Sequence, residues 1–296
     1  MLIRRPLLTL LLFASFLGAC AQAEPTPAPT AQASPTTAPL PSVTPDPTPA
    51  PTPLPICLDT AGKMQQREIQ IPGDDRPLSY WLYLPPCFDA DRVSAYPTLY
   101  LLHGLAQSDS EWLNLGVAET ADALITRGST PPFIIVLPGE RTGFDMMAAV
   151  TEILLPEIER SLPAGGRAEL RAIGGLSRGG GWALRTGMQR PDLFGAIGLH
   201  SPAVLSPDLY SLSTWAADIP PGSIPRLWVD IGSEDTLLRA ALELREQLDK
   251  LRWPYTWTIS HGEHTSTYWS GHLEQYLRWY AEAWPSEDPT RQLVEP

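Results

Sequence analysis

The chain has 296 residues and carries a formal net charge of −12 at pH 7. Hydrophobic residues make up 43% of it and charged residues 18%, which fits a globular protein and excludes a fibrous one. The acidic balance argues against nucleic acid and anionic lipid as partners of the folded part. Only the segment 56–296 has the composition to form a core, and its length suits one α/β domain rather than two.

Residues 1–19 have the features of an export signal. Two arginines at positions 4 and 5 precede an uncharged, mostly apolar run over 7–17, which is too short to span a bilayer as a helix. The run ends in Leu17-Gly18-Ala19-Cys20, which resembles the lipobox of bacterial lipoproteins. That resemblance implies a lipid on the Cys20 thiol and an extracytoplasmic protein anchored to the bacterial cell membrane. Cleavage at 21–23 would instead give a secreted protein without Cys20.

Residues 20–55 are expected to form a disordered tether. The segment 21–55 holds 12 of the 33 prolines of the chain and only two charged residues, Glu24 and Asp46. Pro-rich chains favour extended polyproline II at about 3.1 Å per residue, so the tether could hold the folded domain up to roughly 100 Å from the membrane. The sequence leaves open whether its Thr-Pro pairs carry O-linked sugar.

Cys57 and Cys87 are the cysteines that remain after Cys20. They flank the first two expected strands, and an oxidising compartment permits a disulfide between them. Two unpaired buried thiols are the alternative. The chain has no Cys-x-x-Cys, His-x-x-x-His or His-Glu-x-x-His motif, so we expect no metal site and no cofactor.

Apolar and β-branched runs alternate with helical patterns through the folded part. We expect strands over 67–71, 78–84, 98–102, 133–137, 170–176, 196–199, 226–231 and 255–259. We expect helices over 111–127, 148–160, 178–189, 236–251 and 268–284. The first two strands form an antiparallel pair around a turn. The alternation that follows predicts an α/β fold with a mostly parallel central sheet covered by helices on both faces.

Gly175-Leu176-Ser177-Arg178-Gly179 is the strongest local signal. It matches G-x-S-x-G, a nucleophile elbow, in which a sharp turn between strand and helix holds the serine Oγ clear of the sheet. The flanking glycines avoid clashes in this turn, and the helix N-terminus favours developing negative charge. An ordinary serine in a glycine-rich turn is the alternative, which the strand before it and the helix after it disfavour.

A nucleophilic serine needs a base, and the base needs an orienting acid that follows the serine along the chain. His264 lies in the loop after the last strand and is the expected base, with His261 as the second choice. Asp235 follows the strand 226–231 and is the expected acid, with its neighbour Glu234 as the second choice. Asp230 lies inside that strand, where we expect a structural role.

An oxyanion hole needs two preorganised N–H donors. One is the amide that follows the nucleophile, on Arg178. The second should come from the loop after the strand 98–102, where His103-Gly104-Leu105 stands. Gly104 lets the backbone turn close to a substrate, and the Leu105 amide is the expected donor.

Four segments together resemble the esterase D-type putative esterases, a family that includes feruloyl and acetylxylan esterases, S-formylglutathione hydrolases and mycolyltransferases. They are Tyr100-Leu101-Leu102-His103-Gly104, Gly175-Leu176-Ser177-Arg178-Gly179-Gly180, Ile231-Gly232-Ser233-Glu234-Asp235 and Gly262-Glu263-His264, with Tyr268-Trp269 nearby. The resemblance covers about residues 60–284. It implies an α/β-hydrolase fold for the domain 56–296, with Ser177, Asp235 and His264 as triad and with Leu105 and Arg178 as donors.

The chain also departs from that family. Pro138-Gly139-Glu140 stands where members often carry Pro-Asp-Gly. The segment between the elbow and Asp235 is short, so we expect no large lid domain and an open, shallow site that suits bulky or polymeric esters. Trp112 and Trp269 could flank a sugar or an aromatic acyl group, although ordinary packing is favoured for each. His200 is a candidate for the pocket lining, but a hydrogen-bonded core histidine is favoured.

The sequence therefore predicts an exported serine carboxylic ester hydrolase that works through an acyl-enzyme. Its partner would be a small-molecule or polysaccharide-linked ester, such as a feruloyl or acetyl ester. Transfer of the acyl group to a sugar hydroxyl is one alternative, and a non-catalytic binding protein on the same fold is the other. The sequence leaves the ester and the oligomeric state open.

Overall fold

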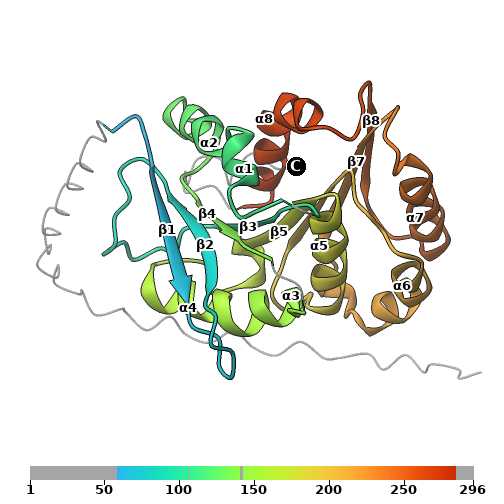
Figure 1. Cartoon of the computed structure of the whole chain (residues 1–296), viewed down its shortest axis with the longest axis horizontal. Helices are drawn as coiled ribbons and strands as arrows, with labels where there is room; N and C mark the ends of the chain where they lie inside the picture. Colours follow the sequence, from blue (N-terminus) through green and yellow to red (C-terminus); the bar gives the residue numbers. More distant parts are fainter. Residues whose placement is uncertain (1–58, 106, 141–142, 285–296) are drawn as a thin grey trace, which may run out of the picture. The chain divides into compact units, whose positions relative to one another are not determined.

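The computed structural model describes residues 59–105, 107–140 and 143–284. One sheet runs through them in the order β1-β2-β4-β3-β5-β6-β7-β8 (Figure 1). β1 and β4 pair antiparallel with β2, and the other neighbours are parallel, which confirms the mostly parallel sheet. The strands are β1 (Lys63–Ile69), β2 (Leu78–Leu84), β3 (Thr98–Leu102), β4 (Ile134–Pro138), β5 (Arg171–Leu176), β6 (Ala196–His200), β7 (Arg226–Gly232) and β8 (Thr256–Ser260).

Helices cover both faces of the sheet, as expected (Figure 1). The helices α1 (Glu111–Asn114), α2 (Val117–Thr126) and α8 (Ser266–Glu282) pack on one face, and α3 (Met146–Ala148), α4 (Leu155–Ser161), α5 (Arg178–Gln189), α6 (Ser206–Asp218) and α7 (Leu238–Leu251) on the other. Among the residues that the structure describes, no helix has the length and apolarity of a membrane span.

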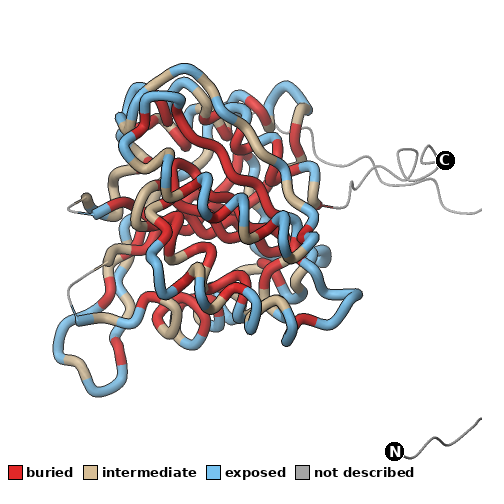
Figure 2. The backbone as a smooth tube through the Cα atoms, turned by 90° about the vertical axis from the view of Figure 1, so that its right-hand side faces the viewer, coloured by how far each residue is buried: buried red, intermediate tan, exposed pale blue. Residues whose placement is uncertain are grey.

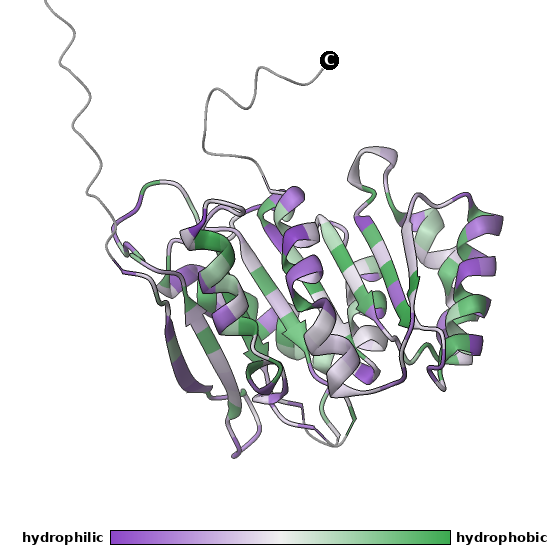
Figure 3. Ribbon diagram, turned by 90° about the horizontal axis from the view of Figure 1, so that it is seen from above, coloured by the Kyte–Doolittle hydropathy of each residue, from purple (hydrophilic) through white to green (hydrophobic). Residues whose placement is uncertain are grey.

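Successive side chains of a strand point to opposite faces of the sheet and therefore pack against different helix layers. In β3, Tyr100 faces the layer of α4 and α5, whereas Leu99 and Leu101 face the layer of α2 and α8. Buried residues consequently run through the middle of the domain (Figure 2). α7 buries Ala241, Leu244 and Leu248 and carries hydrophilic residues on its outer side (Figure 3). The central strands are therefore covered on both faces, which explains their unbroken apolar runs.

Several expected boundaries are wrong. The helix expected over 111–127 is divided into α1 and α2, because Gly116 at φ +90° interrupts the helical backbone. The helix expected over 148–160 begins at Met146 and contains a π-helical stretch, Ala149–Leu154, just before Pro156. Proline cannot donate the regular helical hydrogen bond, which accounts for the change of register there. The first strand begins four residues and ends two residues earlier than expected, at Lys63–Ile69 instead of 67–71.

The chain between the nucleophile elbow and the loop after β7 forms no large lid. Residues 178–234 contain α5, β6, α6, a short 3₁₀ turn and β7. The sequence analysis missed α6, in which only Asp208 and Leu212 are fully buried while Leu209, Trp215 and Ala216 are partly buried against the core. The expected signal 1–19 and tether 20–55, together with the start of the domain at 56, lie outside the described residues.

A buried polar network joins α8 to the sheet. The Asp230 carboxylate on β7 accepts hydrogen bonds from the hydroxyls of Tyr268 (3.0 Å) and Tyr276 (2.9 Å). Its other oxygen lies 2.7 Å from His200 Nδ1 on β6. Asp230 is 1% and His200 0% exposed, so these bonds replace the water that both groups lose. Asp230 has the structural role expected from its place inside the strand.

The Tyr280 hydroxyl also belongs to this network and packs against two glycines on neighbouring strands. It lies 3.0 Å from His200 Nε2. Gly174 on β5 and Gly198 on β6 are register partners, and a Cβ added to either would stand 1.7 or 1.9 Å from this hydroxyl. The paired glycines therefore provide the space that the tyrosine occupies.

Replacement of Gly198 by alanine is expected to lower the free energy of unfolding by about 3 kcal/mol, because overpacking and a lost buried hydrogen bond combine. Chemical denaturation measures this change. The matched control is Gly271→Ala on α8, whose added Cβ would meet nothing within 4 Å and should stabilise the helix by up to about 1 kcal/mol. Equal effects of the two substitutions would contradict the role of the glycine pair.

Cys87 lies just after β2 and is disulfide-bonded. Cys57 lies outside the described residues, so its pairing with Cys87 stays a prediction. Peptide mapping of the exported protein without reductant should show one linked peptide that contains both cysteines, and two alkylatable thiols would refute it. The bridge closes about thirty residues, which corresponds to about 3.5 kcal/mol in the chain-entropy model.

Candidate active site

Ser177 stands in a strained turn between β5 and α5. Its backbone has φ +53° and ψ −120°, a conformation that side chains rarely adopt. Close approach of the backbone on both sides requires the glycines of the motif: a Cβ on Gly175 would lie 2.4 Å from Gly179, and one on Gly179 would lie 2.2 Å from the Leu102 carbonyl. The turn lifts the Ser177 side chain above the carboxyl edge of the sheet, as the G-x-S-x-G pattern predicts.

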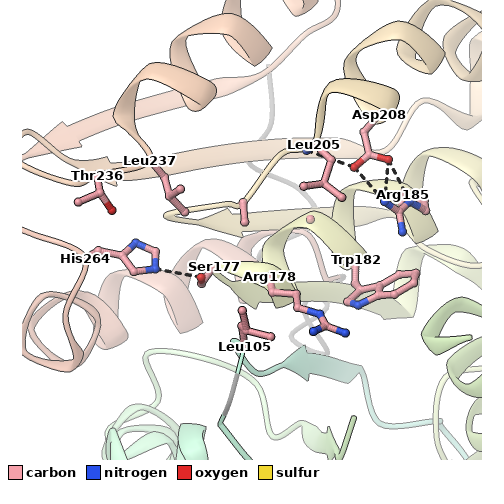
Figure 4. Close-up of a pocket in the computed structure, with 12 residues that line it drawn as sticks. Leu105, Ser177, Arg178, Trp182, Arg185, Leu205, Asp208, Thr236, Leu237 and His264 are labelled. Carbon is pink, nitrogen blue, oxygen red and sulfur yellow. Dashed lines mark hydrogen bonds and ion pairs between the residues drawn. The ribbon is translucent and has the colours of Figure 1, made fainter. Parts of the chain in front are cut away.

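A continuous line of hydrogen bonds leads from Ser177 to Asp235 through His264. His264 Nε2 lies 2.9 Å from Ser177 Oγ, as the dashed line in Figure 4 marks. His264 Nδ1 lies 2.8 and 3.0 Å from the two Asp235 carboxylate oxygens. The serine comes from the end of β5, the acid from the loop after β7 and the histidine from the loop after β8. The structure thus brings together the three residues selected from the sequence.

Asp235 is held as a carboxylate. Its side chain is fully buried, and burial alone would raise its pKa. Hydrogen bonds from His264 (2.8 Å) and from the Leu237 amide (2.7 Å) outweigh burial, so the pKa of Asp235 is lowered. An ionised Asp235 accepts from His264 Nδ1 and leaves Nε2 free to accept a proton from Ser177.

The alternative acid and base lie elsewhere. Glu234 and His261 contact each other at 3.3 Å, with 52% and 88% of their side chains exposed. They form a solvent-facing pair. Neither residue lies among those that line the cavities at Ser177.

The side chain of His103 stabilises the backbone beside Leu105 through two hydrogen bonds. The ring of His103 accepts a hydrogen bond from the Glu140 amide at Nε2 (2.9 Å), so Nδ1 carries the proton and donates to the Gly104 carbonyl (2.8 Å). Gln107 Oε1 accepts from the Gly104 amide at 2.9 Å. Leu105 therefore projects from a tight, internally bonded turn beside Ser177 (Figure 4).

Two cavities meet at Ser177. The larger, of about 550 Å³, extends along the first two turns of α5. It is lined by Leu105, Ser177, Arg178, Gly181, Trp182, Arg185, Ala203, Leu205, Asp208, Thr236, Leu237 and His264. The smaller, of about 400 Å³, lies on the other side of His264 and is lined by Leu105, Gln107, Ser177, His264, Thr265, Ser266 and Trp269.

The three candidate binding residues have different positions. Trp269 lines the smaller cavity, with its ring centroid 4.9 Å from that of His264. Trp112 is 1% exposed and donates from Nε1 to the Leu102 carbonyl, so the expectation of a ligand-flanking role for Trp112 is wrong. His200 lines neither cavity, because the Asp230 network holds it in the core. It is therefore the hydrogen-bonded core histidine that the sequence favoured, and its candidate place in the pocket lining is wrong.

Sequence reasoning selected Arg178 for its amide but missed the side-chain pairs at the far end of the larger cavity. Arg178 pairs with Glu140, which also accepts from Trp182 Nε1 at 3.2 Å. Arg185 pairs with Asp208 through three hydrogen bonds of 2.8 to 3.0 Å. The spacing of 178, 182 and 185 puts the three side chains on one face of a helix, which is the sequence signal that could have indicated them.

No cluster of three or more metal-ligating side chains exists among the residues that the structure describes. The groups assembled at Ser177 are suited to nucleophilic attack and proton transfer: an exposed hydroxyl, an imidazole and an ionised carboxylate.

The sheet order and the elbow define an α/β-hydrolase. A family model described as putative esterase matches residues 74–282, and the chain belongs to this family. An endo-1,4-beta-xylanase/feruloyl esterase of Xylanibacter ruminicola is 30% identical over 130 residues, which cover 40% of this chain. That match spans 18% of the length of the curated relative.

Solved structures with the same fold include two groups of esterases. A ferulic acid esterase is similar with a TM-score of 0.68 and 24% identity, over 76% of this chain and 100% of that one. An S-formylglutathione hydrolase from Staphylococcus aureus has a TM-score of 0.64 and 18% identity, over 75% and 98% of the two chains. These likenesses confirm the expected fold.

Proposed function

We propose that the protein is a serine carboxylic ester hydrolase with Ser177 as nucleophile, His264 as general base and acid, and Asp235 as the residue that orients His264. The observation that carries this proposal is the line of hydrogen bonds from Ser177 Oγ through His264 to a buried, ionised Asp235. Membership of the putative esterase family supports it.

Acylation begins when His264 Nε2 takes the Ser177 proton as Oγ forms a bond to the ester carbonyl carbon. The carbonyl oxygen becomes an oxyanion, which the Leu105 and Arg178 amides stabilise. Arg178 is the first residue of α5, so its N–H has no acceptor within the helix and points to the helix N-terminus. The bond to the alcohol oxygen then breaks, and His264 gives its proton to that oxygen.

Deacylation repeats these steps with water. His264 removes a proton from a water molecule as its oxygen attacks the acyl carbon, and the same two amides stabilise the second oxyanion. The bond to Ser177 Oγ breaks, His264 returns the proton to Oγ, and the free acid leaves.

The proposed substrate is an ester of an acetyl or feruloyl type, free or linked to a carbohydrate. One relative is named an endo-1,4-beta-xylanase/feruloyl esterase, and several structures with this fold are ferulic acid esterases, including one from Anaeromyces mucronatus in complex with ferulic acid. A site that is open on two sides of Ser177, with no large lid within 178–234, supports access for a bulky ester.

The proposed location is outside the cytoplasm. Residues 1–19 would direct export, Cys20 would carry the lipid, and the Pro-rich tether would separate the esterase domain from the membrane. Metabolic labelling with a fatty-acid analogue tests this anchor, since Cys20→Ser should abolish the label and release the protein from the membrane fraction.

A panel of p-nitrophenyl esters of graded acyl length, together with methyl ferulate and feruloylated oligosaccharides, tests the activity. We expect release of the free acid, and labelling of Ser177 by a fluorophosphonate should block it. Folded protein that hydrolyses none of these esters would overturn the proposal. Product analysis with and without a sugar acceptor distinguishes hydrolysis from acyl transfer.

A further inference from the structure

The larger cavity ends at a wall formed by α5. Arg178, Trp182 and Arg185 project from one face of this helix, and Figure 4 shows Trp182 at the end remote from His264, with Arg178 between them. Trp182 is five positions after Ser177, which corresponds to about 7.5 Å along a helix. The wall therefore stands at the distance of an acyl group rather than beside the reacting carbonyl.

The Trp182 ring is fixed from two directions. Its Nε1 donates to Glu140 at 3.2 Å, and the Arg185 guanidinium lies over the ring, 4.5 Å from its centroid. Arg185 is fixed in turn by Asp208, whose side chain is only 4% exposed. A ring held by a hydrogen bond at its edge and by a cation on one face is rigid, and an acyl group would stack on the face that Arg185 leaves uncovered.

The charges at this end of the cavity compensate one another. The larger cavity has three charged residues in its lining: Arg178 pairs with Glu140 from outside the lining, and Arg185 pairs with Asp208. Leu105, Ala203, Leu205 and Leu237 supply apolar surface to the same cavity. Such a lining suits an uncharged acyl group, because a carboxylate would have to compete with the acidic partners for the arginines.

Geometry decides which half of the ester enters this cavity. The oxyanion must face the Leu105 and Arg178 amides, and the alcohol oxygen must face His264 Nε2, which protonates it. The acyl chain takes the remaining direction, away from His264 and along α5. The alcohol is left to the smaller cavity, where Gln107, Thr265 and Ser266 lie near Trp269.

We propose that Trp182 is the residue that determines acyl specificity, and that it selects flat, conjugated, uncharged acyl groups over saturated chains of similar size. This inference rests on the esterase function proposed above. The Trp182 ring and a flat conjugated acyl group are both rigid, so stacking them costs little conformational entropy. A saturated acyl chain has many rotatable bonds, and ordering these bonds against the ring costs conformational entropy.

The test compares methyl cinnamate with methyl nonanoate, whose acyl groups contain the same number of carbons. The measured quantity is the ratio of kcat/KM for the two esters, in the wild type and in variants. Trp182→Leu should lower the cinnamate-to-nonanoate ratio about fivefold, the effect of losing one aromatic pair. Trp182→Phe, which keeps a ring, should retain most of the ratio. Trp182→Met provides an independent flexible replacement with the same expected loss.

Trp257→Leu is the matched control. Trp257 on β8 also lies under an arginine, Arg245, at 5.4 Å, but it lines neither cavity at Ser177. Its replacement should leave the ratio unchanged. An unchanged ratio in active Trp182→Leu or Trp182→Met would overturn the inference and leave the esterase function intact. A wild type that hydrolyses neither these esters nor the wider panel, and that is not labelled at Ser177, would overturn the proposed function itself.

Discussion

Ser177→Ala should lower kcat for ester hydrolysis by about 10⁴-fold or more, because Ser177 carries the hydroxyl that is hydrogen-bonded to the base His264. The substitution removes one oxygen from a side chain that makes no contact within the core, so the variant should fold normally. Steady-state kinetics on p-nitrophenyl acetate measures the loss, and far-UV circular dichroism with thermal unfolding checks the fold.

A neighbouring serine provides the control for this experiment. Ser201 directly follows β6, close to Asp235, and is fully buried, and its hydroxyl has no hydrogen-bond partner among the described residues. Ser201→Ala should therefore reduce activity far less than Ser177→Ala and should leave fluorophosphonate labelling in place. A folded Ser177→Ala variant that keeps most of its esterase activity is incompatible with the proposed mechanism.

Asp235→Asn should reduce kcat by about 10⁴-fold, since an amide of the same size can present an N–H to His264 Nδ1 and stabilise the wrong tautomer. Because the native pKa of Asp235 is lowered, the carboxylate also contributes stability above its unfolded pKa. That contribution is lost as the pH falls through the lowered pKa. The variant should therefore have a lower kcat than the wild type at neutral pH. Its free energy of unfolding should also fall less than that of the wild type as the pH is lowered.

Glu234→Gln and His261→Gln are the matched controls for the acid and the base. Glu234 is an acidic residue next to Asp235, and His261 is a histidine three positions before His264. The side chains of Glu234 and His261 nevertheless face solvent. Each should cost much less than tenfold in kcat. If Glu234→Gln proved more damaging than Asp235→Asn, or His261→Gln more damaging than His264→Gln, the assignment of acid or base would be wrong.

The central strands and the elbow could be predicted because their causes are local. The run at 98–102 is apolar throughout since β3 is buried on both faces, and Gly175 and Gly179 are imposed by a turn that spans five residues. The positions of Asp235 and His264 followed from the order of strands, because both lie in loops at the carboxyl edge of a parallel sheet.

The remainder of the site depends on contacts that no local pattern encodes. Trp182 meets Glu140 across 42 residues of chain, and Arg185 meets Asp208 across 23. α6 packs Leu209, Leu212 and Trp215 on the core, but only Leu212 of these is fully buried, and its helical pattern was not recognised in the sequence. Core positions were favoured for His200 and Trp112 from the sequence and are what the structure shows, but their partners, Asp230 and the Leu102 carbonyl, could not be predicted from a local pattern.

The docking of α8 also determines when His264 can reach Ser177. A ribosome delivers Ser177 long before His264, which follows it 87 residues later, and the loop that holds His264 leads directly into α8. The three tyrosines of that helix reach their partners only when β5, β6 and β7 already lie side by side, with Gly174 and Gly198 in register. The base of the proposed triad is therefore in place only in a chain whose last described helix is docked on the complete sheet.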